Sequence, residues 1–263
     1  MREVPHDSPG LIGVPCGDLG RYVRLYDALD KLIVPQGSEL RFATGANVAH
    51  NCNALVKELL TKPDFEWLWI MGDDHGFSED VLLKLLARQV DIVVPIVSRR
   101  GAPFQTVLYK VAALDASTYL TYSWGDLTRD YPAGGLIQVD AAGSAGMLIR
   151  RHVFSLIEDP WFEWTRRISE DVNFCLKARK AGISINADLE QILTHITPAE
   201  LTPYRNKAGE WNVAANSGGR SVSLTNTPHG GKDLREITYG HKDGVGGAEW
   251  SAPPEPDAQY KAA

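Results

Sequence analysis

The chain has 263 residues, 44% of them hydrophobic and 23% charged, so it can bury a core of ordinary size in one large α/β domain or two small ones. The net charge of −6 argues against general binding to nucleic acid or to a membrane surface, although local basic doublets could still bind phosphate. The three cysteines, Cys16, Cys52 and Cys175, lie far apart with no CxxC pair, so neither a disulfide framework nor a cysteine zinc site is indicated.

The sequence carries no targeting signal that we can identify. Residues 1–6 lack an apolar core, and no stretch reaches the ~18 consecutive apolar residues that a membrane span needs. Together with the isolated cysteines, this leads us to expect a reducing, cytoplasmic location.

The first half of the chain has the pattern of repeated β-loop-α units. Residues 11–15 form a short apolar strand, and residues 16–20 form a turn at its carboxyl end. From residue 21 onward, apolar side chains recur at three- and four-residue steps, as one buried helix face requires. These side chains are Tyr22, Val23, Leu25, Tyr26, Leu29 and Leu32. Residues 39–44 alternate like a strand, and Asn47 can cap the helix that follows.

Two further strands extend this pattern into a sheet. Residues 65–71 are an apolar run, followed by a helix that starts near Ser78 with acidic residues in its first turn. Residues 91–96 form a continuous apolar run, which is typical of a strand covered on both faces. The alternation predicts an α/β fold with a mostly parallel, Rossmann-like central sheet flanked by helices. Ligands of such sheets bind beyond the carboxyl ends of the strands, where residues 16–18 and 73–75 would lie.

The second half contains shorter elements. Residues 107–110 and 136–139 look like strands, on either side of an aromatic and polar segment around residues 122–124. Residues 169–171 cap a helix that stops at Gly182, and a last strand over residues 183–185 precedes the segment 192–195. Beyond residue 203 the chain is rich in Gly, Asn, Ser and Pro. We therefore expect residues 204–263 to form an irregular, partly disordered arm.

Asp73, Asp74 and His75 follow the third strand without a spacer. On an extended backbone Asp73 and His75 point to one side and Asp74 to the other. One oxygen ligand and one nitrogen ligand at i and i+2 make half a site for a divalent ion such as Mn²⁺, Mg²⁺ or Zn²⁺. The simpler interpretation is a polar turn in which Asp74 caps the next helix, and the three residues alone slightly favour it.

The order of these pieces resembles a GT-A fold glycosyltransferase of the glycosyltransferase family 2 type. The resemblance covers residues 11–196. It rests on the opening strand, the Asp-Asp-His motif at 73–75, the sequence Gly-Ser-Ala-Gly-Met-Leu-Ile from Gly143, the helix that begins Ser-Glu-Asp-Val at Ser169, and the late His195. It implies a GT-A domain over residues 1–203, with a donor-binding half at about 10–110 and a smaller, mixed acceptor half at about 111–203.

The resemblance assigns a metal site to this domain. Asp73, His75 and His195 would ligate Mn²⁺ or Mg²⁺ bridging the diphosphate of a nucleotide sugar, such as a UDP-sugar, and Asp74 would contact the ribose or the metal. An ion there stabilises the charge on the leaving nucleoside diphosphate. Histidine stands where the commonest motif has aspartate, and Asp-x-His with a distant histidine is similar to the pattern of polypeptide N-acetylgalactosaminyltransferases, which retain anomeric configuration. His195 alone would more simply be a core histidine.

The resemblance also assigns an acidic pair to catalysis. Asp171 matches the general base of an inverting hexosyl transfer, and Glu170 stands beside it. Helix capping and compensation of the helix dipole would explain an acidic pair at this position as well.

Donor-binding residues would come from several loops of the domain. By resemblance they are Pro15, Cys16, Asp18, Asn51, Asp74, Arg99, Gly143, Ser144 and Ala145. Ordinary loop polarity would equally explain the positions in the first two units, and Arg99 with Arg100 could be a solvated basic pair.

Other functional classes fit parts of the sequence. A sugar nucleotidyltransferase needs a glycine-rich signature after its first strand, which residues 17–21 lack. A non-catalytic nucleotide-sugar-binding or glycan-binding protein would need neither Asp171 nor a metal. The acceptor hydroxyl stays open among a glycan, a small molecule, a protein side chain and a hydroxymethylated base in phage-type DNA. We rank a carbohydrate or small hydroxyl first, because only the arginine doublets at 99–100, 150–151 and 166–167 could form a phosphate track.

Overall fold

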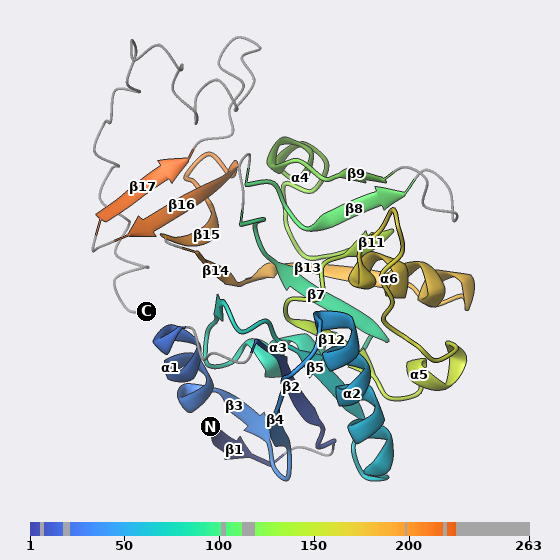
Figure 1. Cartoon of the computed structure of the whole chain (residues 1–263). Coiled ribbons are helices and arrows are strands. Elements are labelled where there is room, and N and C mark those ends of the chain that lie inside the picture. The colour runs from blue at the N-terminus through green and yellow to red at the C-terminus, as the bar shows by residue number, and fades with distance from the viewer. Residues whose placement is uncertain are drawn as a thin grey trace.

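The structure, a computed structural model of the chain, describes residues 1–5, 8–17, 22–100, 104–111, 119–197, 199–217 and 220–224. Its centre is a seven-stranded sheet (Figure 1). In spatial order the strands are β10 (Leu136–Val139), β13 (Ile185–Ile192), β7 (Ile92–Ile96), β12 (Met147–Arg150), β5 (Trp67–Ile70), β2 (Leu11–Pro15) and β4 (Glu39–Ala43).

This sheet is mostly parallel, as the sequence predicted. The pairs β2 with β4, β2 with β5, and β13 with β7 are parallel. Strand β12 lies antiparallel between β5 and β7, and β10 is antiparallel at the edge. The carboxyl ends of β2, β4, β5, β7 and β13 therefore meet at one edge of the sheet, where ligands of such sheets bind.

Helices cover both faces of the sheet (Figure 1). The strand β5 shows why, because Leu68 and Ile70 belong to one buried cluster while Trp67 and Trp69 belong to the other. One face packs against α1 (Val23–Lys31) and α3 (Val81–Ala87), and the other against α2 (Val48–Thr61), α5 (Val153–Leu156) and α6 (Glu170–Lys180).

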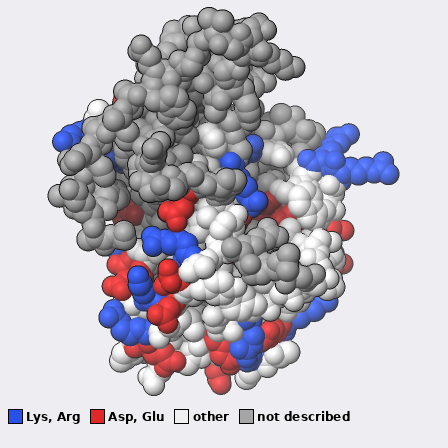
Figure 2. All heavy atoms as spheres, turned by 60° about the vertical axis from the view of Figure 1, so that its left-hand side comes forward, with Lys and Arg blue, Asp and Glu red and all other residues white. Residues whose placement is uncertain are grey.

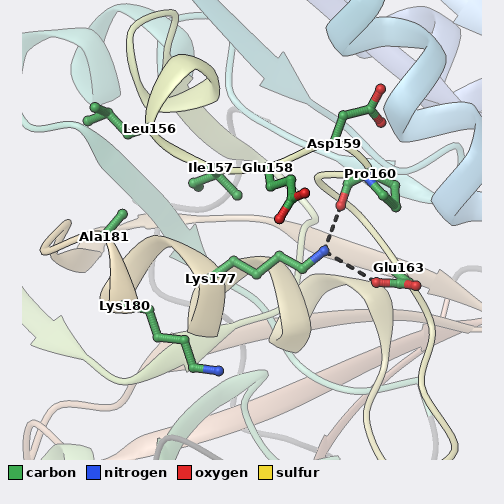
Figure 3. A pocket seen from close by; sticks show the side chains of 9 residues that line it. All are labelled: Leu156, Ile157, Glu158, Asp159, Pro160, Glu163, Lys177, Lys180 and Ala181. Atoms are coloured by element: carbon green, nitrogen blue, oxygen red, sulfur yellow. Dashed lines mark hydrogen bonds and ion pairs between the residues drawn. The ribbon is translucent and has the colours of Figure 1, made fainter.

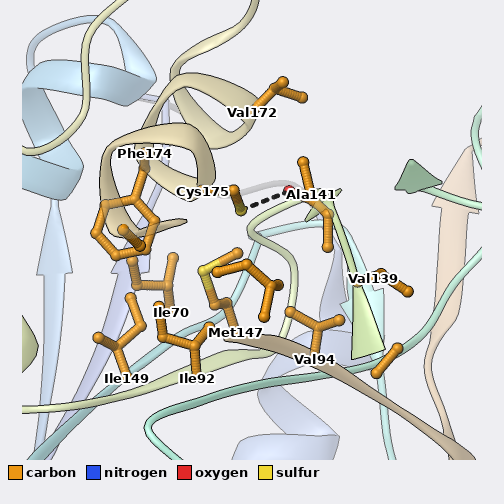
Figure 4. Close-up of a cluster of buried hydrophobic side chains, with 14 of the residues drawn as sticks. Ile70, Ile92, Val94, Val139, Ala141, Met147, Ile149, Val172, Phe174 and Cys175 are labelled. Atoms are coloured by element: carbon orange, nitrogen blue, oxygen red, sulfur yellow. Dashed lines mark hydrogen bonds between the residues drawn. The ribbon is translucent and has the colours of Figure 1, made fainter. Parts of the chain in front are cut away.

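The larger cluster anchors α6 to the sheet (Figure 4). Phe174 and Cys175 project from α6 toward Met147 and Ile149 of β12, and the Cys175 thiol donates to the carbonyl of Ala142 over 3.7 Å. Burying one apolar side chain of this size contributes about 1.5–3 kcal/mol. The packing fixes the amino end of α6, with its acidic pair, against the sheet.

The predicted buried face of the first helix is partly wrong. Leu25, Ala28 and Leu29 are buried in α1, whereas Val23 is 75% exposed and Tyr26 47% exposed. The helix thus turns its Leu25 and Leu29 stripe to the core. Helix α2 agrees with the prediction, and its cap Asn47 accepts a hydrogen bond from the backbone N–H of His50.

The aromatic segment of the second half is more regular than expected. It contains β9 (Tyr119–Thr121) and α4 (Trp124–Asp130), which starts with a reciprocal capping box between Ser123 and Asp126. Strands β11 (Ala141–Ala142), β8 (Leu108–Val111) and β9 form a small antiparallel sheet. A further pair joins β1 (Arg2–Val4) to β3 (Ile33–Pro35).

The expectation of an irregular arm from residue 204 is wrong as far as residue 224. A second sheet contains, in spatial order, β17 (Arg220–Leu224), β16 (Trp211–Ser217), β15 (Ala199–Arg205), β14 (Thr194–Thr197) and β6 (His75–Gly76). Trp211 and Val213 of β16 alternate inward and are buried in the larger cluster, so core packing overrides the polar, turn-rich composition. The expected boundary at residue 203 falls inside β15, and residues 225–263 lie outside the described part of the chain.

Within the described residues, every helix is too short or too polar to cross a membrane.

Candidate metal and donor site

The turn after β5 places two acidic side chains and a histidine at the carboxyl edge of the sheet. Strand β5 ends at Ile70, Asp73 and Asp74 lie in a turn, and His75 begins β6. The expectation that Asp73 and His75 share one side assumed an extended backbone, and the turn removes that alternation. Asp74, rather than Asp73, is the carboxylate that lies with the two histidines.

Strand pairing brings the distant histidine to this turn. His195 of β14 is the direct register partner of His75 in β6, and the backbone N–H of Ile196 donates to the carbonyl of Asp74 over 2.7 Å. The two imidazole rings stack with centroids 4.5 Å apart. The late histidine and the early motif, far apart in the sequence, thus form one site.

Asp74, His75 and His195 form a compact group of possible ligands. Each offers one ligand atom within 4.8 Å of the others. His75 Nδ1 lies 2.8 Å from Asp74 Oδ1, and His195 Nε2 lies 3.4 Å from Asp74 Oδ2. Asp74 and His75 are each only 4% exposed, so the group is shielded from bulk water.

Hydrogen bonds leave one ring nitrogen of His195 as an acceptor. Its Nδ1 lies 2.8 Å from the carbonyl oxygen of Ser98, which can only accept, so Nδ1 carries the proton and Nε2 carries the lone pair. His75 Nε2 is buried without a hydrogen-bond partner among the described residues. A buried nitrogen in this state is costly unless a ligand satisfies it.

The electrostatics favour an ionised Asp74 and a neutral His75, which are the forms that bind a cation. Burial opposes ionisation of Asp74, but the neighbouring His195 and His75 outweigh it and keep the pKa of Asp74 below its usual range. Burial lowers the pKa of His75, against the opposing attraction of Asp74. An ionised carboxylate and a neutral imidazole are the states a metal ion requires. The donor set of one oxygen and two imidazole nitrogens fits Mn²⁺ or Zn²⁺ better than Mg²⁺, which prefers oxygen ligands.

Arg100 also contacts this group. The sequence indicated Arg100 only as one member of the basic pair with Arg99. Arg100 Nη2 donates to Asp74 Oδ2, and its Nε donates to His195 Nε2 over 3.3 Å. Its neighbour Arg99 points elsewhere, with Nη2 donating to Thr121 over 3.1 Å and the guanidinium 5.4 Å from the ring centroid of Tyr109.

The acidic pair lies in the first turn of α6. Ser169 occupies the N-cap position, and its hydroxyl donates to Asp171, which also accepts from the N–H of Val172 over 2.7 Å. Asp171 is half-buried, whereas Glu170 is 5% exposed and its Oε2 has no hydrogen-bond partner within the described part of the chain. Burial raises the pKa of Asp171, and burial with repulsion from Asp171 raises the pKa of Glu170 to about 7.

The segment from Gly143 to Gly146 connects the acidic pair to the histidine strand. A Cβ on Gly143 would lie 3.6 Å from Asp171 Oδ2, and one on Gly146 would lie 2.7 Å from the side chain of Leu193, which directly precedes β14. Four residues span at most about 14 Å. The acidic pair and the histidine strand therefore belong to one region, with Ser144 and Ala145 between them.

Of the nucleotide residues predicted from the first two units, the structure brings Pro15, Cys16 and Asn51 together. Pro15 ends β2, and the Asn51 side chain of α2 donates to the carbonyl of Cys16 over 3.3 Å. Asp18 lies outside the described residues.

A separate cavity of about 600 Å³ contains none of the predicted site residues (Figure 3). Lys177 projects from α6 toward it and donates to the carbonyl of Pro160 and to Glu163. Its wall comprises Leu156, Ile157, Glu158, Asp159, Pro160, Glu163, Lys177, Lys180 and Ala181.

Comparison with solved structures agrees with this architecture. The chain is similar to A197 from STIV, with 18% identity and a TM-score of 0.54 over 77% of this chain and 90% of that one. It is also similar to GalNAc-T7, solved with UDP, GalNAc and Mn²⁺, with 9% identity and a TM-score of 0.50 over 72% of this chain and 44% of that one. No family model and no curated protein matches the chain. Likeness at these identities establishes the fold alone, and that fold is the predicted GT-A fold.

Proposed function

We propose that the protein is a metal-dependent glycosyltransferase that moves a sugar from a nucleotide-sugar donor to an acceptor hydroxyl. The observation that carries this proposal is the convergence of Asp74, His75 and His195 at the carboxyl edge of a GT-A sheet. We further propose a UDP-sugar as the donor. The similar fold of GalNAc-T7, which was solved with UDP and Mn²⁺, supports this choice.

Asp74, His75 and His195 would hold the divalent ion, with Mn²⁺ preferred over Mg²⁺ because two of the three ligands are imidazole nitrogens. When bound, such an ion offsets the negative charge that develops on the leaving diphosphate. The chain positions these ligands through the β6–β14 pairing and through the hydrogen bond from His195 to Ser98. In this arrangement Asp74 replaces Asp73 as the carboxylate ligand.

The remaining donor contacts come from neighbouring loops. Pro15, Cys16 and Asn51, with Asp18, would hold the nucleoside, and Gly143, Ser144 and Ala145 would lie along the transferred sugar. Arg99 lies against Tyr109. Burial raises the pKa of Tyr109, the charge of Arg99 opposes this rise and the charge of Asp171 adds to it, which supports assigning Arg99 to the acidic-pair side of the site.

Asp171 is the proposed general base for an inverting displacement. The acceptor hydroxyl loses its proton to a carboxylate on the face opposite the leaving group, and Asp171 is the more accessible member of the acidic pair. Its raised pKa makes it a better proton acceptor than an exposed aspartate. Hydrogen bonds from the Ser169 hydroxyl and the N–H of Val172 orient the Asp171 carboxylate.

Calorimetry of UDP binding with Mn²⁺ and with a chelator tests the metal site. We expect tight binding only with Mn²⁺, because the side chains of Asp74, His75 and His195 alone cannot neutralise a diphosphate. His195→Ala should weaken Mn²⁺ and UDP binding together and leave the metal-free melting temperature near that of the parent. His152→Ala, which removes an exposed histidine paired with Asp91, is the matched control. Equal UDP affinity under both conditions would refute the metal assignment.

Transfer assays test the base. Asp171→Asn should lower transfer by about 10²-fold or more while UDP and Mn²⁺ binding stay unchanged. Asp159→Asn, at an exposed position, should transfer at the parent rate. Near-parent transfer by Asp171→Asn, or a product with retained configuration, would exclude the inverting mechanism. Slow Mn²⁺-dependent hydrolysis of a UDP-sugar separates an enzyme from a non-catalytic binding protein.

A further inference from the structure

The contacts of Arg100 fall on the atoms that a metal ion would need. Arg100 follows β7 in the same segment as Ser98, which orients His195. Its Nη2 donates to Asp74 Oδ2, and its Nε lies 3.3 Å from His195 Nε2. The Arg100 side chain is 51% exposed, while that of Asp74 is only 6% exposed. A solvent-reached guanidinium thus extends onto a buried carboxylate.

A guanidinium and a metal ion cannot use these atoms together. With Nδ1 protonated against Ser98, His195 has a single lone pair, on Nε2, and that lone pair either accepts from Arg100 or coordinates a cation. A dication bound to the same Asp74 oxygen would lie next to the positive charge of Arg100, and like charges this close repel one another. The two occupants are therefore mutually exclusive.

We propose that Arg100 is a built-in competitor of the divalent cation: it neutralises Asp74 and caps His195 in the metal-free protein and must swing away before the ion binds. This inference rests on the metal site of the proposed function, and it adds a residue that lowers the affinity of that site for the divalent cation. The half-exposed position of Arg100 makes the release feasible, because the guanidinium regains water when it leaves. The chain thereby avoids an unpaired buried carboxylate while metal-free.

Titration of Mn²⁺ into the metal-free protein, followed by the electron paramagnetic resonance signal of free Mn²⁺, tests the competition. We expect Arg100→Ala to bind Mn²⁺ about tenfold more tightly than the parent, in line with the loss of charge-assisted hydrogen bonds at a half-exposed side chain. Arg100→Lys, which keeps the charge but not the planar fork, should fall between the two.

Arg129→Ala is the matched control for the loss of one positive charge. It removes an exposed guanidinium that pairs with Asp126 and Asp130 of α4 rather than with the metal ligands. Its Mn²⁺ affinity should stay within about threefold of the parent, since screened charges act weakly over such distances. A second readout is thermal: Arg100→Ala should lower the melting temperature without metal and increase the rise that Mn²⁺ produces.

The outcomes separate the two proposals. If Mn²⁺ binds the parent and is lost in His195→Ala, but Arg100→Ala binds it no more tightly than the parent or than Arg129→Ala, the competition is refuted and the metal site stands. Weaker binding by Arg100→Ala refutes it in the same way. If neither the parent nor Arg100→Ala binds Mn²⁺, the metal site and the competition both fail.

Discussion

The geometry of the group Asp74, His75 and His195 requires that residue 72 carry no side chain. A Cβ there would lie 2.7 Å from His75 Nδ1 and 3.1 Å from Asp74 Oδ1. The His75 ring cannot retreat freely, because it stacks on His195. Gly72→Ala should therefore displace two ligands and lower Mn²⁺ affinity by about ten- to a hundredfold, the usual effect of disturbing a metal ligand's support. Calorimetric titration measures it.

Gly125→Ala controls for the added methyl group. Its Cβ would meet only Ser123 Oγ, at the ordinary contact distance of 3.6 Å, so Mn²⁺ affinity should not change. Unchanged affinity in Gly72→Ala would mean that the Asp74 and His75 side chains do not bind the ion in the arrangement seen here.

Glu170 should make the stability of the protein depend on pH. Burial and Asp171 raise its pKa from 4.5 to about 7 in the folded state. Both states hold the proton below pH 4.5, and the unfolded state releases it first as the pH rises, so stability falls between about pH 4.5 and 7. The loss is at most about 3 kcal/mol, less where solvent screens the group.

Glu170→Gln should remove this loss. Urea unfolding should show the variant more stable than the parent at pH 8, with the advantage gone at pH 4.5. Glu66→Gln, at an exposed position, controls for the replacement of a carboxylate by an amide. An advantage for Glu170→Gln that is equal at both pH values would contradict the raised pKa.

The sequence predicted part of the geometry of this candidate site and missed part for identifiable reasons. The resemblance implied that His75 and His195 lie together, and the register of β6 with β14 brings them together. The choice of Asp74 over Asp73 depends on where β5 ends, and alternation cannot locate that end. The contact of Arg100 with Asp74 and His195 depends on where the segment after β7 lies in the folded chain, and a pair of arginines in the sequence does not predict that position.

Among the secondary-structure elements, strands β14, β15 and β16 connect His195 to the hydrophobic core. Strand β14 pairs with β6 on one side and with β15 on the other. Trp211 of β16 is 3% exposed, lies 5.6 Å from the ring of Trp124 and is covered by the guanidinium of Arg205. The sheet that holds His195 is thus part of the main folding unit.

Trp211→Ala should for this reason destabilise the entire domain. We expect a loss of about 3–5 kcal/mol in the free energy of unfolding, the usual cost of truncating a buried aromatic residue. Trp164→Ala, at a position 55% exposed, should cost less than about 1 kcal/mol. Denaturant unfolding followed by circular dichroism distinguishes them. If the main unfolding transition of Trp211→Ala is unchanged, the result would favour the original expectation that this part of the chain is an irregular arm.

The polar composition beyond residue 203 led to the wrong prediction of an irregular arm, because composition averages over the two faces of a strand. The strands of the central sheet were predictable from continuous apolar runs, which only a doubly covered strand requires. In β16 two inward side chains, Trp211 and Val213, suffice for burial although their neighbours are polar. In α4 the capping box of Ser123 and Asp126 was present in the sequence and is the signal that could have revealed the helix.

Across the entire chain, the distribution of charge bears on the acceptor. The net charge is −6, and the described part of the face in Figure 2 shows acidic and basic side chains interspersed rather than a basic track. The doublet at 150–151 lies at the end of β12 that pairs with the start of β5, at the opposite edge of the sheet from the ligand group. The Arg151 guanidinium there donates to the carbonyls of Leu59, Leu60, Lys62 and Phe65.

These observations argue against a DNA acceptor. Arg151 closes the carboxyl end of α2, and Arg99 lies on Tyr109, so the three doublets do not line one phosphate path. We expect hydroxymethylated duplex DNA to bind more weakly than about 10⁻⁴ M at physiological salt, below the range of ordinary non-specific binders. With a labelled UDP-sugar and Mn²⁺, label should pass to small carbohydrate acceptors and not to DNA. Transfer to the duplex that falls steeply between 50 and 200 mM salt, as neutralisation of about 6–10 phosphates requires, would make DNA the acceptor instead.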